Sequence, residues 1–431
     1  MKNNICHNRH PQKGLTLIIL VLLLIIVGSA TYIAQLNANN IQAMRAEKTA
    51  KALMEAKKAL LGYAVTVNLK VLASDPCPIA CRRPGDLPCP DTNSDGEADT
   101  SCDDAEERLG RLPWKTLGLG DLRDGNGDRL WYAVSNNFKN NPKVMPLNNN
   151  SLGTIHITDF GGLVSANATG STGAVAVIFS TGTPLTRQDG IQQIRSDTNA
   201  NIASHYLDNA LGEDNADFLD STANGFVKGV VRDAAGDIIL NDQLLVISQK
   251  DIFNAIDTKV LKEVKLALTT FYIAYNYYPM PASFADTNCL DTTTVAACNS
   301  GLLNEGRIPA TGWVATSILR AESNNNWFQQ NEWREHVYYA VSPACTLPLF
   351  PNCTGIGTAL TLNGAVNGAT SKNMILLMAG PSLSGQSRGT NLQKIVQSNY
   401  YELENATLLD GIYQRTIPLT ITFNDSVESI P

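Results

Sequence analysis

The sequence has few charged residues, few histidines and no catalytic motif. Only 17% of its residues are charged, and the net charge of -7 argues against nucleic-acid binding through a basic surface. Of the five histidines, His7 and His10 lie in the basic leader, and His156, His205 and His336 stand outside any Cys- or His-based metal-binding motif. No GxSxG, HExxH or P-loop motif occurs, and GPSLSG at 380–385 lacks the spacing of a nucleophile elbow. We therefore expect neither an enzyme nor a nucleic-acid-binding protein, and we assign no catalytic residue.

Proline and charge are both absent from a long stretch near the amino terminus. No proline occurs over residues 15–75, and no charged side chain lies between Lys13 and Arg45. The nearly unbroken run of Leu, Ile and Val that starts at residue 15 is long enough to cross a bilayer as a helix. A secretory signal peptide is the alternative, but it would have a shorter apolar region followed by a small-residue cleavage site. The sequence predicts a membrane-spanning helix over 15–34, with the basic leader 1–14 in the cytoplasm.

Helical patterning continues beyond the apolar run. Residues 35–67 keep strong helix formers and place Leu53, Leu60 and Ala64 on one stripe, with Lys48 and Lys51 elsewhere. The sequence therefore predicts one long helix, of which the second half is amphipathic and packs on a globular domain. An anchor joined to an unrelated amphipathic helix is the alternative.

Cysteine occurs in an even number beyond the apolar run. The eight cysteines there form four close sequential pairs: Cys77 with Cys81, Cys89 with Cys102, Cys289 with Cys298, and Cys345 with Cys353. Such pairs are typical of disulfides in an oxidising compartment. A zinc site would need CxxC-like pairs or cysteines with histidines, which are not present. We assume local pairing, although each half of the chain allows three connectivities.

An acidic loop between Cys89 and Cys102 is a candidate calcium site. Its oxygen-bearing side chains recur on alternate residues, with a glycine at the sixth place: Asp91, Asn93, Asp95, Glu97 and Asp99. This spacing matches the first part of an EF-hand-type loop, but Cys102 occupies the twelfth place, where a bidentate glutamate is expected. The alternative is a solvated acidic turn, because Asp, Asn and Gly are common loop residues. Calcium is the one cofactor that the sequence suggests.

The chain also contains an internal repeat. The words GRLPW and LWYAVS of the first half recur as GRIPATGW and VYYAVS in the second half, each set between a helical pattern and a later apolar strand. Four landmarks in the same order indicate a tandem duplication. We predict a first domain over 35–247, which includes the amphipathic half of the helix, and a second domain over 248–431.

The junction between the leader and the apolar run resembles the type IV prepilin signature. Lys13 and Gly14 end a basic leader directly before Leu15, and in this family a prepilin peptidase cuts after the glycine and methylates the new amino terminus. The resemblance implies cleavage between Gly14 and Leu15. The family usually has glutamate at the fifth mature position, where this chain has Ile19. The large minor pseudopilin of type II secretion systems also lacks that glutamate, so Ile19 favours a minor or tip subunit.

The resemblance implies a fold, partners and a location. The fold class would be α+β: a long N-terminal transmembrane-plus-amphipathic helix, then two pilin-like domains, each with a helix packed on an antiparallel sheet. Partners would be other pilin-like subunits, the prepilin peptidase and an inner-membrane assembly platform, and Gly28, Ser29 and Ala30 would permit close helix packing. The chain would be a single-pass protein of the bacterial inner membrane, with its C-terminal domains in the periplasm or on an envelope filament. The alternative hypothesis is a stand-alone, membrane-anchored periplasmic protein that binds a ligand or adhesion target and is not incorporated into a filament.

Overall fold

The fold is described from a computed structural model of the chain. The described residues are 15–66, 83–144, 146–167, 172–218, 225–290, 298–299, 301, 303–313, 317–320, 327–346, 353, 358–365, 368–407, 410–415 and 422–430. Within the first helix, side chains are described for residues 19–25 and 40–66. The predicted leader 1–14, with Gly14, and the predicted pair Cys77 and Cys81 lie outside the described residues.

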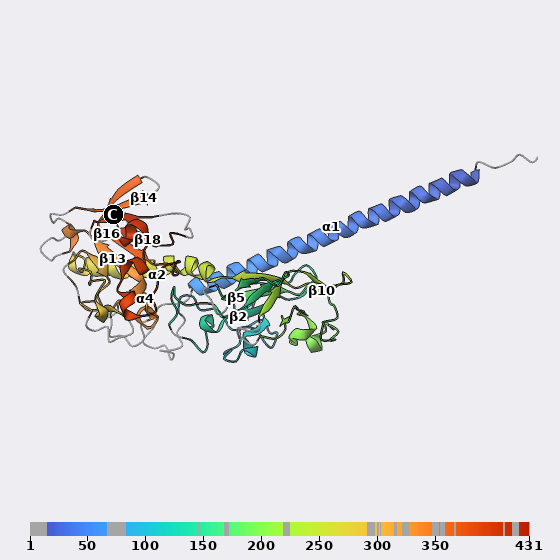
Figure 1. The fold of residues 1–431 in the computed structure, drawn as a ribbon, viewed down its shortest axis with the longest axis horizontal. Helices are drawn as coiled ribbons and strands as arrows, with labels where there is room; N and C mark the ends of the chain where they lie inside the picture. The colour runs from blue at the N-terminus through green and yellow to red at the C-terminus, as the bar shows by residue number, and fades with distance from the viewer. Residues whose placement is uncertain are drawn as a thin grey trace, which may run out of the picture.

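The chain begins with α1, a helix of 52 residues over Leu15–Thr66. No proline interrupts it, and its second half is rich in Ala, Leu and Lys, which favour helix. Buried positions recur every three or four residues from Thr49 to Ala64, and they pack on the first domain. Figure 1 shows the earlier part projecting away from the globular body, and we call residues 15–48 the arm. The predicted stripe is confirmed at Leu53, Leu60 and Ala64.

The first domain is built on an antiparallel sheet of order β1-β2-β5-β11. Its strands are β1 (Leu109–Arg111), β2 (Trp131–Val134), β5 (Ala176–Ser180) and β11 (Gln243–Ile247). Alternate residues of a strand face opposite sides of the sheet. Tyr132 therefore belongs to the core under α1, whereas Trp131 belongs to a second core on the other face. β5 lies between β2 and β11, and all five of its residues are buried.

The second domain repeats this plan with α2 (Gln249–Tyr275) on a sheet of order β12-β13-β16-β18. The strands are β12 (Glu305–Arg307), β13 (Val337–Val341), β16 (Met374–Met378) and β18 (Ser426–Ile430). The registers agree between the domains, because Gly110 pairs with Tyr132 as Gly306 pairs with Tyr339. The repeated sequence motifs thus occupy the same two strands of each sheet.

Smaller sheets cover the face of each large sheet that lies opposite the helix. They contain β4 (Val164–Ala166), β3 (Ile157–Asp159) and β8 (Phe226–Lys228) in the first domain, and β15 (Gly368–Lys372), β14 (Leu360–Ala365) and β17 (Ile412–Gln414) in the second. In both, the first strand of the hairpin pairs with the third strand in parallel. Two-stranded ribbons of the first domain are β6 (Asn209–Ala210) with β7 (Glu213–Asp214), and β9 (Val231–Arg232) with β10 (Ile238–Leu240). Short helices are α3 (Trp327–Gln330), α4 (Trp333–His336) and α5 (Asn391–Lys394).

The predicted fold class is wrong in its transmembrane part and incomplete in its sheets. Among residues whose side chains are described, no helix has both the length and the apolar composition needed to cross a membrane. This finding also corrects the predicted membrane span over 15–34, the single-pass description and the inner-membrane location. One antiparallel sheet per domain was predicted, and the smaller sheets with parallel pairs were not.

Candidate functional site

The predicted assembly residues lie at the start of α1. Leu15 is its first residue, and Ile19 is 49% exposed. All side chains over residues 19–25 are Ile, Leu or Val, and they are 47% to 65% exposed. Gly28, Ser29 and Ala30 are in the helix, but their side chains lie outside the described set. A row of exposed aliphatic side chains on a projecting helix is a surface that another apolar surface is expected to cover.

Three of the four predicted disulfides are present. Cys89 is bonded to Cys102, Cys289 to Cys298, and Cys345 to Cys353. Each closes a short local loop, with sequence separations of 13, 9 and 8 residues. The local connectivity assumed from the sequence is therefore confirmed for these three pairs.

The predicted calcium loop forms a compact turn held by its own side chains. Asn93 Oδ1 accepts a hydrogen bond from the N–H of Asp95, and Asp95 Oδ1 accepts one from the N–H of Glu97. Asp99 Oδ2 accepts from the hydroxyl of Thr92 at 2.5 Å. The first two are Asx-type turn bonds, in which the side chain replaces a backbone partner, and the third joins two side chains across the loop.

Asp91 is the buried member of this loop. Its Oδ2 accepts from the N–H of Gly96 at 2.7 Å, while its Oδ1 is buried without a hydrogen-bond donor. Burial raises the pKa of Asp91, against the lowering effect of the backbone bonds. In the described part of the chain no three His, Cys, Asp or Glu side chains gather into a group that could hold a metal ion. The single orphaned oxygen does not make a calcium site, and calcium binding stays a prediction.

The first domain contains a buried hydrogen-bond network of carboxylate and amide side chains beside the start of β11. Asp242 Oδ2 accepts hydrogen bonds from the N–H of Asp208 at 2.8 Å and from Asn215 Nδ2 at 3.0 Å. The carboxylate of Asp208 accepts from Gln193 Nε2 at 2.8 Å and from the N–H of Asn241 at 2.7 Å. The network ties the start of β11 to loops that are far apart in the sequence.

The second domain contains the same network. Asp425 Oδ2 accepts from the N–H of Glu402 at 3.2 Å and from Asn405 Nδ2 at 3.0 Å. The carboxylate of Glu402 accepts from Gln386 Nε2 at 2.8 Å and from the N–H of Asn424 at 3.0 Å. Each bond has its counterpart in the first domain, so this network belongs to the repeated unit.

The two acids of each network lie close enough to influence one another. Burial, and then the charge of Asp208, raises the pKa of Asp242 well above its ordinary value. Burial raises the pKa of Asp208 to about 6. In the second domain, burial and then Glu402 raise the pKa of Asp425. Two adjacent buried carboxyl groups do not both ionise easily, which favours the protonated form of Asp242 and of Asp425.

Sequence reasoning missed these acids, although one signal for them is present. An Asn-Asp doublet, Asn241-Asp242 and Asn424-Asp425, directly precedes the last strand of each sheet. A glycine packs against each asparagine side chain: Gly182 against Asn241 and Gly380 against Asn424. The segment between β5 and β8 contributes Gln193, Asp208 and Asn215 to the first network.

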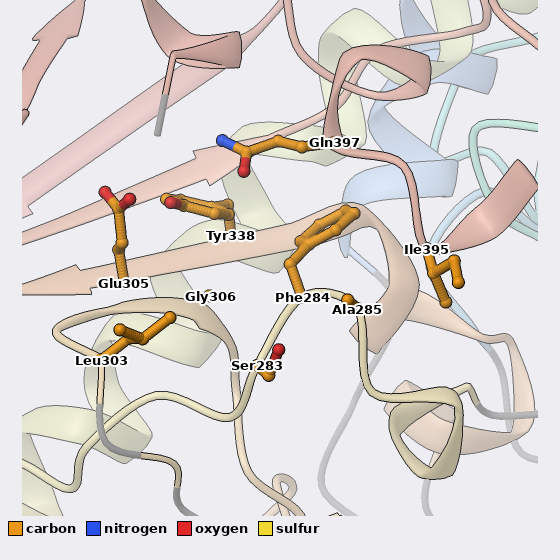
Figure 2. Close-up of a pocket in the computed structure, with 9 residues that line it drawn as sticks. All are labelled: Ser283, Phe284, Ala285, Leu303, Glu305, Gly306, Tyr338, Ile395 and Gln397. Atoms are coloured by element: carbon orange, nitrogen blue, oxygen red, sulfur yellow. The ribbon is translucent and has the colours of Figure 1, made fainter. Parts of the chain in front are cut away.

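Figure 2 shows a small pocket in the second domain between β12, β13 and the segments around residues 284 and 395. Its volume is about 150 Å³, and Phe284 and Leu303 contribute apolar walls. Glu305, Tyr338 and Gln397 bring polar groups to one end. Burial, followed by the charge of Glu305, raises the pKa of Tyr338.

The first domain has a pocket at the equivalent place. It measures about 170 Å³ and is lined by Asp91, Leu109 and Trp131, among others. Leu109 and Glu305 hold the same sheet position, since they pair with Ala133 and Ala340. Ligand pockets usually measure roughly 300–1,000 Å³, so each of these cavities has room for about one side chain. Neither brings together a nucleophile and a base.

Comparisons with protein-family models, with curated proteins and with solved structures find no match for this chain. The interpretation of the site therefore depends on the residues and contacts of this molecule. Its two distinctive features are the exposed apolar arm and the doubled domain with its repeated buried network.

Proposed function

We propose that this chain is a structural subunit of a type IV pilus-like or type II secretion-like filament, in a minor or tip position. In this proposal a prepilin peptidase cleaves it after Gly14, and an assembly platform joins it to other pilin-like subunits. The observation that carries the proposal is the arm, which projects from the globular body and exposes seven consecutive aliphatic side chains at residues 19–25.

A bundle of similar helices would cover this surface. Burying one large aliphatic side chain contributes about 1.5–3 kcal/mol, so several such residues supply a strong driving force for association. A single arm cannot bury its exposed side chains on itself, because a straight helix does not fold back. Arms of other subunits, aligned side by side, would provide the missing contacts.

The position in the filament is argued from Ile19. In the family that the leader resembles, a glutamate at this place is understood to pair with the terminal amine of a neighbouring subunit. Ile19 cannot make that pair. A subunit with no neighbour ahead of it does not need the contact, which supports a minor or tip position.

The proposal is tested by placing a charge on the arm. Leu24, which is 65% exposed, is changed to glutamate in the full chain, and Leu266 on α2, which is 60% exposed, receives the same change as a control. We expect L24E to remove the chain from the sheared filament fraction, because a buried unpaired carboxylate opposes bundling. L266E is expected to remain in that fraction.

Two outcomes would contradict the proposal. One is equal incorporation of L24E and the unchanged chain. The other is a native protein that begins at Met1 in cells containing a prepilin peptidase, measured by intact-mass analysis. A chain that is never found with other pilin-like subunits would instead favour the stand-alone binding protein.

A further inference from the structure

The second domain is seated on the first in a staggered arrangement. Lys57 Nζ of α1 lies 2.9 Å from a carboxylate oxygen of Asp251, in the first turn of α2. Further along, the N–H of Gly85 bonds to Ala64 of α1, and Ile256 of α2 packs against the same glycine. The last turns of α1 therefore lie beside the first turns of α2, and Figure 1 shows α2 continuing away from the arm.

Because the two domains are repeats, the displacement of the second domain relative to the first can be derived from equivalent residues. Lys57 donates to the carbonyl of Val246 in β11, and Lys265 donates to the carbonyl of Ser429 in β18. Val246 and Ser429 hold the same position in their sheets, so Lys57 and Lys265 are equivalent. Lys57 meets Asp251, which precedes Lys265 by fourteen positions in α2. The second domain is therefore displaced by about 21 Å along the helix direction.

The first turns of α2 bury an apolar strip against the end of the first domain at which α1 terminates. We call this end of the domain, which includes Gly85 and Phe138, the leading end. Ile252, Phe253 and Ile256 are fully buried. The ring of Phe253 lies 6.1 Å from that of Phe138 in the first domain. This strip and the leading end form an interface between two pilin-like units within one chain.

The side chains of the corresponding strip of α1 are exposed, although Gly125 of the first domain lies against the backbone of Arg45. With Lys57 equivalent to Lys265, Met44 takes the place of Ile252, and Met44 is 69% exposed. Ile41, one turn earlier, is 53% exposed. Arg45 and Lys48 stand where Phe253 and Ile256 stand in α2, and both are exposed. We call residues 41–48 the docking strip.

We infer that the docking strip receives the leading end of a neighbouring pilin-like subunit, in the way that the first domain receives α2. This inference rests on the proposed function. The partner is a globular domain that combines an apolar centre, to cover Ile41 and Met44, with acidic groups, to meet Arg45 and Lys48. It lies about 21 Å behind the first domain along the direction of α1.

The test uses a photo-crosslinking residue, p-benzoylphenylalanine, in the full chain expressed in its source cells. It replaces Met44 in one variant and Ile273, which is 74% exposed on α2, in the control. Irradiation at position 44 is expected to give an adduct with a protein that mass spectrometry identifies as carrying its own N-terminal apolar helix. The control is expected to give no such adduct.

A third variant separates this inference from the proposed function. The crosslinker at Leu24 reports bundling of the arm. An adduct with a pilin-like chain at position 24 but none at position 44 would overturn the docking strip and leave the filament function standing. Absence at both positions would count against the filament function as well.

Charge reversal tests the chemistry of the partner. The double change Arg45→Glu and Lys48→Glu is expected to lower the position-44 adduct by about tenfold, because it places like charges opposite the acidic groups. Lys58→Glu, at an exposed position of α1 outside the docking strip, is expected to leave the adduct unchanged. An equal yield in the double variant and the unchanged chain would refute an acidic partner.

Discussion

The two domains share their interior and differ at their surfaces. Asp208 and Asp242 of the first domain correspond to Glu402 and Asp425 of the second, with the same donors around each pair. By contrast, α1 continues into the exposed arm, whereas the strip at the start of α2 is fully buried against the first domain. The comparison teaches that the acid network belongs to the fold, while the helix surface determines what each domain can join.

A buried arginine in the first strand gives the largest expected effect. Arg307 donates to the carbonyls of Phe284, Glu335 and Lys394, and Arg111 donates to those of Ala200 and Arg129. Alanine leaves these buried acceptors without donors. We expect Arg307→Ala to lower the free energy of unfolding by about 4 kcal/mol and Arg111→Ala by about 3 kcal/mol.

Urea unfolding of the full chain, followed by circular dichroism, measures both arginine variants. Exposed Arg232→Ala serves as the control and is expected to change the free energy by less than about 0.5 kcal/mol. If Arg111→Ala and Arg307→Ala both matched this control, the buried arginines would not stabilise the two domains, and if only one matched it, the two interiors would not be equivalent.

The glycines beside the two asparagines give the next effect. A Cβ at Gly182 would overlap Asn241 Oδ1, and Gly182 also has a φ of +54°, in the left-handed region. A Cβ at Gly380 would crowd the Asn424 side chain, without that backbone strain. We expect Gly182→Ala to cost about 3 kcal/mol and Gly380→Ala about 2 kcal/mol in unfolding free energy. The reverse order in urea titrations would show that packing at the two sites differs.

The acid pairs predict a smaller, pH-dependent effect. The pKa of Asp208 is about 6 in the folded chain and 3.8 is its ordinary value, so the folded state holds a proton that the unfolded state releases. This contribution to stability is complete below about pH 4 and is lost as the pH rises through 6. Asp242→Asn removes the other carboxyl group of the pair, whose own pKa is raised well above its ordinary value by burial and then by the charge of Asp208.

We therefore expect the Asp242→Asn chain to gain stability relative to the unchanged chain as the pH rises from 4 to 7, because the folded unchanged chain holds a proton on Asp242 that its unfolded state releases. Asp425→Asn is expected to shift stability in the same direction. Urea titrations at unit steps of pH measure the difference, which cancels the contributions of other carboxylates. A difference that is constant across this range would show that the pairs hold no shared proton.

Much of the repeated frame was predictable from the sequence. The words around Gly110 and Gly306 mark the first strand of each sheet, and those around Tyr132 and Tyr339 mark the second. These elements could be predicted because the alternation of side chains along a strand and the preference of certain residues for turns depend on only a few neighbouring positions. The short cysteine spacings likewise predicted three disulfides.

The parts that failed depend on long-range contacts. Asp242 meets Asp208 across more than thirty positions, and neither lies in a motif that indicates burial. Calcium binding stays a prediction: it counted the oxygens of Asp91 to Asp99, and backbone N–H groups of the same loop donate to two of the counted side chains, Asn93 and Asp95. The membrane span was inferred from an uncharged apolar run and the basic leader before it, and the described part of α1 does not bear it out.

The junction between the domains has a mechanical consequence. β11 ends at Ile247 and α2 begins at Gln249, so Ser248 alone connects them, and its side chain caps the new helix by accepting from Asp251. Lys57 holds the same aspartate from the side of α1. A tensile load applied to the far end of the molecule would therefore reach the arm without slack, and the chain would transmit a pull or a push as a stiff rod.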